Sequence, residues 1–211
     1  LVSMSNRHNG RTGMGLVMAS KNLKAVVVRG TKKVQVASQK ALTELNRIGP
    51  KALPENGDMD GLAKFGTAVV VLFNNTIGTL PTRNYNEGQF ESCEPLSGEK
   101  MAETILKERD TCYACVVRCK RVVEIKAGAY KADPRYGAPE YENLGTFGSY
   151  CGISDLAAVS LANQICNEYA VDTIACGATI AFAMECFEKG IITTKETGGL
   201  ELKFGNTDAM L

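Results

Sequence analysis

The stretch SDLAAVSLANQICNEYAVDTIACGATIAFAMECFEKG, residues 154–190, decides the fold class, because it holds two helical patterns in succession. In the first, Ser154 or Asp155 can cap a helix whose apolar residues recur at near-helical spacing. In the second, Asp172 can cap a helix that ends at Gly190, and its apolar face consists mostly of small residues that permit close packing. The stretch therefore favours a mostly α fold.

Upstream, Ser38 can cap a helix that runs to Ile48 and stops at Gly49 and Pro50, and Ser97 can cap another. The apolar run at residues 67–73 is ambiguous, because its propensity predicts a strand and its periodicity cannot decide. The run LKAVVVRG at residues 23–30 predicts a strand that is buried on both faces. We therefore expect residues 1–35 to be a β tail and residues 36–211 to be an incomplete helical domain.

The net charge, the length of the apolar runs and the cysteine count limit the kinds of partner and site to expect. The 211 residues carry a net charge of +1, which gives no electrostatic reason to expect nucleic acid or a membrane as a partner. No apolar run is long enough to span a bilayer, and no export signal is visible, so we expect a cytoplasmic protein. The chain begins with Leu1 and has eight cysteines. We expect a piece of a longer protein whose clustered cysteines serve metal or redox chemistry.

Three cysteines lie in one short run, TCYACVVRCK at residues 111–120, with the spacing C-x2-C-x3-C. This spacing favours Cys112, Cys115 and Cys119 as ligands of an iron–sulfur cluster, because such runs supply most of the four thiolates that a cluster needs. The nearby cations Arg118, Lys120 and Arg121 would lower the thiol pKa values and offset an anionic cluster. A structural zinc site is the alternative, although it usually shows a second ligand pair.

The glycine-rich turn at residues 10–15 lies beside Arg7 and Arg11. Glycines allow close backbone approach and arginines bind phosphate bidentately, so the turn could bind an anion or phosphate. A plain surface turn explains the same residues equally well.

The segment GAPEYEN at residues 137–143 has two acidic residues around a tyrosine. A carboxylate here could serve as a proton donor or acceptor near a buried cofactor. First-turn acids that satisfy a helix dipole are the simpler explanation from the residues alone.

Taken together, five ordered segments resemble the aldehyde:ferredoxin oxidoreductase family of tungsten or molybdenum bis-pterin enzymes. They are spread over almost the whole chain, and five ordered matches are more specific than any one alone. The segments are RHNGRTGMGLVMASKNLKA (7–25), LPTRNY (80–85), the cysteine run, APEYE (138–142) and CNEYAVDTI (166–174).

The resemblance implies one tungsten or molybdenum held by two pterins, beside a 4Fe-4S cluster. It implies a β domain 1 followed by helical domains 2 and 3, so that this chain would hold the end of domain 1 and most of domain 2. Domain 3 would supply the fourth cluster cysteine. Residues 68–73 would be helical.

The resemblance also assigns residues. It implies that Cys112, Cys115 and Cys119 are cluster ligands. Arg7, Arg11 and Gly13 belong to the segment that meets the pterin phosphates, and His8 is the candidate for a backbone carbonyl that binds a bridging magnesium. Glu142, preceded by Tyr141, matches the carboxylate close to the metal. Asn167 and Asp172 occupy the ends of a pterin-contact motif.

The chain departs from the family pattern at three positions. Asn167 replaces an aspartate, which keeps hydrogen bonding to the pterin but removes the charge. Ala170 replaces a glycine, and Val116 stands where many members have proline. The active-site histidine of aldehyde-oxidising members lies beyond Leu211.

The resemblance implies an enzyme that oxidises aldehydes to carboxylic acids, with electrons leaving through the cluster to ferredoxin or a partner subunit. We also expect an oligomer. One alternative within the family is the tungsten subunit of a benzoyl-CoA reductase-like enzyme, since Asp133-Pro134-Arg135-Tyr136 is compatible with either. An alternative of another class is a non-catalytic, zinc-stabilised helical interaction module.

Overall fold

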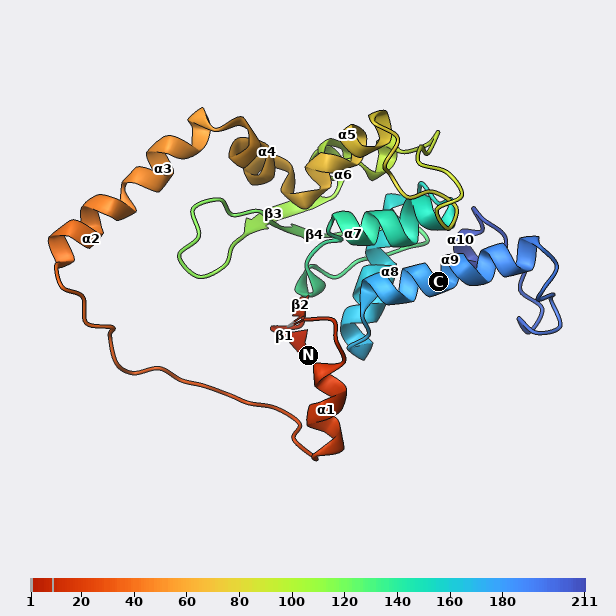
Figure 1. Cartoon of the computed structure of the whole chain (residues 1–211), viewed down its shortest axis with the longest axis horizontal. Coiled ribbons are helices and arrows are strands. Elements are labelled where there is room, and N and C mark those ends of the chain that lie inside the picture. The colour runs from red at the N-terminus through yellow and green to blue at the C-terminus, as the bar shows by residue number, and fades with distance from the viewer. Residues whose placement is uncertain (1, 9) are drawn as a thin grey trace.

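The computed structural model describes residues 2–8 and 10–211 of the chain. Helices hold 49% of the residues and strands 7%, which confirms the prediction of a mostly α fold. Figure 1 shows a packed body of helices and, apart from it, an N-terminal segment that extends along one side before it rejoins the body.

The two longest helices are α8 (Leu156–Tyr169) and α9 (Thr173–Glu188). The two helical patterns at residues 154–190 predicted both. Asp155 caps α8, because its carboxylate accepts hydrogen bonds from the amides of two first-turn residues. Asp172 caps α9 in the same way through the amide of Ile174. Gly190 follows the end of α9 with φ of 69°, the left-handed conformation that ends helices.

The centre of the body is a continuous buried segment, residues 141–151. It begins with α7 (Tyr141–Asn143), continues as a π-helical turn (Leu144–Gly148) and ends as a 3-10 turn (Ser149–Cys151). All five residues of the π turn are buried. Helix α9 packs closely on this turn at Gly177, where an added Cβ would lie 2.8 Å from Thr146 atoms.

Every buried hydrophobic residue of the described chain lies at or after Ala63. The largest fully buried side chains are Phe90, Phe147, Leu80, Leu96, Met101, Leu144, Ile153 and Met184. One core therefore joins the central segment, α8, α9 and the shorter elements before them.

The shorter helices of the body are α4 (Gly57–Phe65), α5 (Val70–Thr76), α6 (Gly98–Thr104) and α10 (Thr207–Met210). Single 3-10 turns lie at Gly66–Val69, Glu94–Leu96 and Pro134–Tyr136. The run at residues 67–73 is thus helical, as the family resemblance implied. Ser97 caps α6 through the amide of Lys100, as predicted.

A hairpin of β3 (Leu106–Asp110) and β4 (Lys120–Val123) stands beside these helices. The strands are antiparallel, and the register pairs Arg109 with Arg121 and Asp110 with Lys120. The loop of this hairpin is the cysteine run, so its position follows directly from the strand register.

The N-terminal segment consists of β1 (Val2–Ser3), β2 (Arg7–His8), α1 (Met14–Ser20), an irregular stretch to Ser38, α2 (Gln39–Asn46), α3 (Ile48–Ala52) and a 3-10 turn (Leu53–Glu55). β1 and β2 form a short antiparallel pair. Ser38 caps α2, as predicted.

Two predictions for this segment are wrong. Residues 23–30 form no strand, and Val27 is 91% exposed, because no described strand pairs with this run and a lone strand leaves its backbone groups without partners. The helix after Ser38 ends at Asn46 rather than Ile48, and a new helix then runs through Gly49 and Pro50. Pro50 is tolerated because first-turn amides have no intrahelical partner.

Among the described residues, no helix is both long enough and apolar enough to cross a membrane.

Candidate functional site

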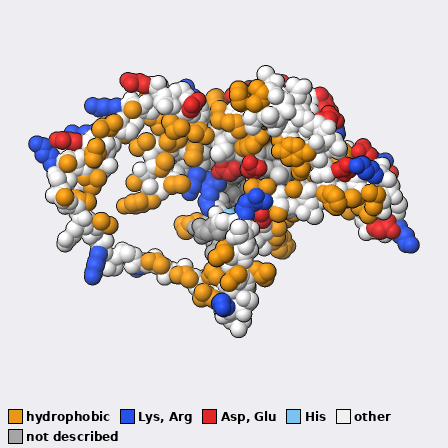
Figure 2. All heavy atoms as spheres, in the orientation of Figure 1, with side chains coloured by type: hydrophobic (Ala, Val, Ile, Leu, Met, Phe, Trp, Pro, Cys, Tyr) orange, Lys and Arg blue, Asp and Glu red, His pale blue; other side chains and the backbone are white. Residues whose placement is uncertain are grey.

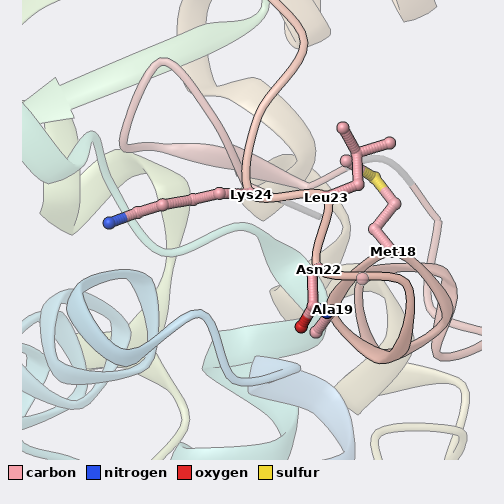
Figure 3. A pocket seen from close by; sticks show the side chains of 6 residues that line it. Met18, Ala19, Asn22, Leu23 and Lys24 are labelled. Atoms are coloured by element: carbon pink, nitrogen blue, oxygen red, sulfur yellow. The ribbon is translucent and has the colours of Figure 1, made fainter.

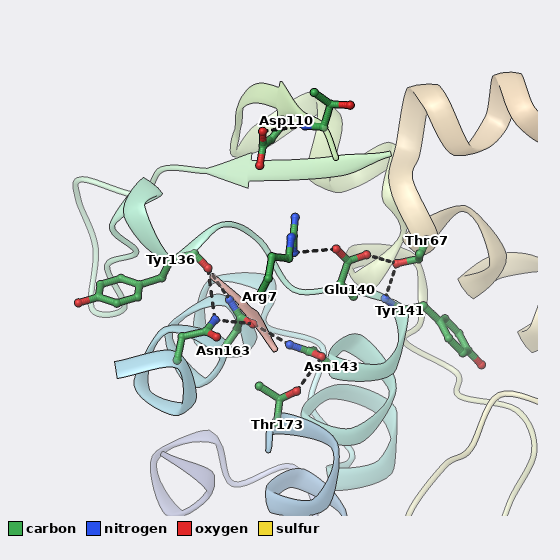
Figure 4. Close-up of polar contacts among 11 residues, drawn as sticks. Arg7, Thr67, Asp110, Tyr136, Glu140, Tyr141, Asn143, Asn163 and Thr173 are labelled. Carbon is green, nitrogen blue, oxygen red and sulfur yellow. Dashed lines mark hydrogen bonds and ion pairs between the residues drawn. The ribbon is translucent and has the colours of Figure 1, made fainter. Parts of the chain in front are cut away.

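The N-terminal strands meet the corner between α8 and α9, and two adjoining cavities lie where they meet. Arg7 and His8 come from β2, and Ala170 and Asp172 come from the turn that joins the two helices. Figure 4 shows Arg7 reaching over this corner toward Glu140, with Asn163, Asn143 and Thr173 below it. The recess is therefore built by residues from opposite ends of the sequence.

The larger cavity has a volume of about 600 Å³. The predicted cofactor residues that line it are His8, Arg11, Gly13 and Asp172. The Nε of Arg11 donates to a carboxylate oxygen of Asp172 at 2.9 Å, and this ion pair fixes the glycine turn against the start of α9. Gly13 has φ of 75°, which only glycine adopts without strain, so the turn presents its backbone to the cavity.

The smaller cavity has a volume of about 160 Å³, and the α8 residues that line it are asparagines. Arg7, His8 and Asn167 line it, together with Asn143, Asn163 and Thr173. His8 borders both cavities, so all six predicted cofactor residues surround one recess. Burial lowers the pKa of His8, and the nearby Asp172 carboxylate opposes that shift.

Several buried polar atoms of this recess have no hydrogen-bond partner. They are Nε and Nη2 of Arg7, Nε2 of His8 and Oδ1 of Asn167. Buried polar groups are normally paired, and each unpaired one costs about 1–3 kcal/mol. Such a set of atoms around a cavity is typical of a site that binds a polar ligand.

Glu140 holds Arg7 in place. Its carboxylate accepts a hydrogen bond from Nη1 of Arg7 at 2.9 Å and another from the hydroxyl of Thr67 at 2.5 Å. The same hydroxyl accepts from the amide of Tyr141 at 2.9 Å, so the 3-10 turn at Gly66–Val69, the start of α7 and β2 meet at one point (Figure 4). Neither Glu140 nor Thr67 was predicted from the sequence as a site residue. Glu140 lay in a recognised segment, whereas Thr67 had no local signal.

Buried amides form a network under the recess. Asn143 Nδ2 donates to Asn163 Oδ1 at 2.7 Å, and the hydroxyl of Thr173 donates to Asn143 Oδ1 at 3.1 Å. Asn167 Nδ2 donates to the backbone carbonyl of Tyr136 at 3.3 Å. These contacts leave the Oδ1 of Asn167 free to accept a hydrogen bond from a ligand.

Tyr141 and Glu142, the predicted catalytic pair, lie at the start of α7 and differ in burial. Tyr141 is half-buried, its hydroxyl accepts from Nδ2 of Asn74 at 2.7 Å, and burial raises its pKa. Glu142 is exposed. Neither residue lines the two cavities around His8.

The three predicted cluster ligands lie in the loop between β3 and β4. Cys112 is exposed, and Cys115 and Cys119 are half-buried. The Cys115 amide donates to the Cys112 carbonyl at 3.1 Å, and Ala114 and Arg118 both adopt left-handed backbone conformations. Over the described residues, no three Cys, His, Asp or Glu side chains converge tightly enough to hold a metal ion, so the shared loop alone brings these cysteines together.

Two cysteines outside the loop, Cys151 and Cys166, differ from those three in burial. Cys151 and Cys166 are buried in the core, and burial raises the pKa of both, to about 12 for Cys166. A thiol held protonated is a poor metal ligand. These two residues therefore pack as small hydrophobic side chains.

A third cavity, of about 360 Å³, lies along the end of α1 and is shown in Figure 3. Met18, Ala19 and Leu23 line it with Asn22 and Lys24. It has one charged side chain and no cluster of polar groups, so it is a weaker candidate than the recess.

The family models match both parts of the chain. Residues 44–211 match "Aldehyde ferredoxin oxidoreductase, domains 2 & 3", and residues 1–30 match "Aldehyde ferredoxin oxidoreductase, N-terminal domain". The chain belongs to the aldehyde ferredoxin oxidoreductase family.

Curated relatives agree with this family. A tungsten-containing aldehyde ferredoxin oxidoreductase of Pyrococcus abyssi is 41% identical over 98% of this chain, and one of Pyrococcus furiosus is 38% identical over 100%. An aliphatic sulfonate oxidoreductase, WOR-like subunit, of Pyrococcus furiosus is 30% identical over 95%. The chain spans about a third of the length of these relatives, since it covers 34%, 34% and 32% of them.

Two departures from the family pattern have visible consequences. Ala170 has φ of 57°, a left-handed conformation that favours the glycine of the family pattern and costs alanine about 1–2 kcal/mol. Asn167 donates to the Tyr136 carbonyl, which an ionised aspartate could not do.

The residues present fit the groups that the family implies. The unpaired guanidinium nitrogens of Arg7 suit phosphate oxygens, and the free Oδ1 of Asn167 suits an N–H of a pterin ring. Three cysteine thiols in one loop suit a cluster that is held by thiolates.

Proposed function

We propose that the enzyme to which this chain belongs oxidises aldehydes to carboxylic acids at a tungsten, or molybdenum, bis-pterin centre. Electrons would leave singly through a 4Fe-4S cluster to ferredoxin or a partner subunit. The observation that carries the proposal is the recess around His8, where unpaired buried atoms of Arg7, His8 and Asn167 surround a cavity. The printed activity of the relatives at about 40% identity supports the substrate class.

Within this proposal, Arg7 and Arg11 bind pterin phosphates, and the backbone at Gly13 approaches them closely. Asn167 and Asp172 contact the pterin itself, and the carbonyl of His8 is the candidate ligand of a bridging magnesium. Glu140 and Thr67 act indirectly, because they hold the guanidinium of Arg7 in its orientation. The division of the chain near residue 35 belongs to the same proposal.

When bound, the metal centre supplies two-electron oxidation and the cluster supplies one-electron transfer. The chain contributes proton transfer, for which Glu142 is the candidate because its carboxylate is exposed in the first turn of α7. Tyr141 is a hydrogen-bonding partner for substrate, and the contact with Asn74 fixes its hydroxyl. Cys112, Cys115 and Cys119 hold the cluster.

The test begins with elemental analysis of the full-length enzyme, purified without oxygen. We expect about one tungsten or molybdenum and about four irons per subunit, because three cysteines here and one elsewhere match a four-iron cluster. Zinc without a heavy metal would contradict the proposal and favour the zinc-stabilised module.

Substitution of Glu142 then tests its role. We expect Glu142→Gln to lower turnover of aldehydes with a viologen acceptor by about 10²–10⁴-fold while tungsten and iron contents stay unchanged, because the amide cannot transfer the proton. Glu188→Gln, an exposed glutamate at the end of α9, is the control and should leave turnover unchanged. Full activity of Glu142→Gln would remove this residue from the mechanism.

The same assay separates the substrate classes. The relative named for aliphatic sulfonates is 30% identical, less than the aldehyde enzymes, so we expect turnover of aldehydes and none of sulfonates. Reduction of an aromatic thioester instead would favour the benzoyl-CoA reductase-like alternative.

A further inference from the structure

Arg121 is a buried cation on β4, and the proposed function gives it no role. The residue is 4% exposed, and no described acidic side chain forms a salt bridge with it. A buried charge is costly unless an opposite charge compensates it, so this arginine requires an explanation.

One nitrogen of Arg121 joins the cysteine loop to the end of α4. Its Nη2 lies 3.1 Å from the carbonyl oxygen of Leu62, 2.7 Å from that of Ala63 and 3.1 Å from that of Arg118. The first two carbonyls belong to the last turn of α4, where the helix dipole favours a cation. The third belongs to the residue that precedes Cys119.

The fit around this contact is tight. An added Cβ at Gly66 would lie 2.9 Å from the carbonyl oxygen of Cys119 and 3.1 Å from both Cγ and Nε of Arg121. The Cys119 backbone and the Arg121 side chain therefore pack on the same glycine. Movement of one would require movement of the other.

The other two nitrogens of the guanidinium are unused. Nε and Nη1 of Arg121 are buried and have no hydrogen-bond partner. Three carbonyl oxygens satisfy one nitrogen but supply no full negative charge. The side chain therefore keeps three N–H donors on its other two nitrogens, and its positive charge beside the third cysteine has no salt-bridge partner among the described residues.

We propose that Arg121 is a positioning residue for the iron–sulfur cluster, which fixes the loop at Cys119 and supplies the buried charge that balances the anionic cluster. This proposal rests on the proposed function, because it requires that Cys112, Cys115 and Cys119 hold a cluster. Hydrogen bonds and charges near a cluster set its reduction potential. Arg121 thus stabilises the reduced, more negative state.

Arg118 provides a matched comparison in the same loop. It directly precedes Cys119, whereas Arg121 follows Cys119 by two residues, and it carries the same charge. Arg118 is exposed, however, and its Nη2 donates to the carbonyl of Arg109. Water screens an exposed charge. At equal separation, a buried charge in a protein with an effective dielectric constant of about 20 acts roughly four times as strongly as a charge in bulk water. Burial, rather than charge alone, distinguishes the two arginines.

The experiment compares Arg121→Gln with Arg118→Gln in the full-length, cluster-loaded enzyme. Iron content is measured first, and the midpoint potential of the cluster is then measured by redox titration, with the spectrum of the reduced cluster as the readout. We expect the potential to become more negative in both variants, with a shift roughly four times larger for Arg121→Gln. An equal or smaller shift for Arg121→Gln overturns the proposal.

Arg121→Lys keeps the test decisive if the glutamine variant does not fold. Lysine retains the charge but loses the planar fork, so we expect an unchanged potential and faster iron release to a chelator than from Arg118→Lys. Release at the rate of the unchanged enzyme overturns the positioning role. Absence of iron from the unchanged enzyme would instead contradict the proposed function, so the two failures are distinguishable.

Discussion

Two regions of the chain differ sharply in burial. No described residue between 10 and 62 is buried, although this region contains many large apolar side chains, including Leu16, Val27 and Val34. The region from Ala63 onward carries the entire described core. Figure 2 shows apolar side chains uncovered along the N-terminal segment, whereas on the packed body they lie among acidic, basic and other groups.

The contrast means that the recess has two walls that differ in packing: the wall from α8 and α9 is held by the core, and the N-terminal wall is not. Asn167 and Asp172 belong to helices that pack into the core, whereas Arg11 and Gly13 belong to the region without buried residues. Ion pairs connect the two walls, and the Arg11 side chain is 55% exposed. Exposed ion pairs contribute only about 0.2–1 kcal/mol, so this contact alone attaches the N-terminal side of the recess weakly.

The largest difference between the regions should come from truncation of a core side chain. Phe147→Ala should lower the free energy of unfolding by about 3–5 kcal/mol, because it leaves a cavity beneath α9. Phe147 is 1% exposed, and Val27, its counterpart in the N-terminal segment, is 91% exposed. Val27→Ala should change the value by less than about 0.5 kcal/mol in urea denaturation. Equal losses would show that both regions fold as one unit.

A pair of glycine substitutions sharpens the comparison. An added Cβ at Gly177 would lie 2.8 Å from the backbone and side chain of Thr146, so Gly177→Ala should cost about 1–3 kcal/mol through overpacking. Gly30 has no atom within 4 Å of the same position, so Gly30→Ala should be neutral or slightly stabilising. Thermal unfolding of the two variants measures both, and a neutral Gly177→Ala would mean that α9 can shift away from the π turn.

The smallest effect should come from the contact between the walls. A double-mutant cycle of Arg11→Ala and Asp172→Ala should give a coupling energy of about 0.2–1 kcal/mol, and the coupling should decrease with added salt. Asp172→Ala alone should cost about 1 kcal/mol more, because it also removes the cap of α9. A coupling that salt does not change would show that the pair is buried.

The local features of the fold could be predicted from the sequence. Asp155, Asp172, Ser38 and Ser97 cap helices as expected, because a cap depends on a side chain and amides two or three residues away. The strand predicted at residues 23–30 does not form. A strand needs a pairing partner from elsewhere in the chain, which the local sequence does not reveal.

The residues of the candidate site also fall into two groups, those that could be named from the sequence and those that could not. Arg7, His8, Arg11, Gly13, Asn167 and Asp172 were named through the family resemblance, and they surround one recess. Glu140 and Thr67 were not given roles there, and Arg121 was named only as one of three cations near the cysteines. The contacts that give these residues their places join positions 58 or more apart. The roles of the cysteines and of Glu142 stay predictions.

The exposed stretch between α1 and α2 has a practical consequence. It contains Arg29, Lys32 and Lys33, and all three are exposed. A trypsin-like protease has unhindered access there, and cleavage would break no contact of the core. A brief digestion should therefore cleave within this stretch and divide the chain into a small N-terminal peptide and a resistant body. Whether the peptide stays bound to the body would report how strongly the two sides of the recess hold together.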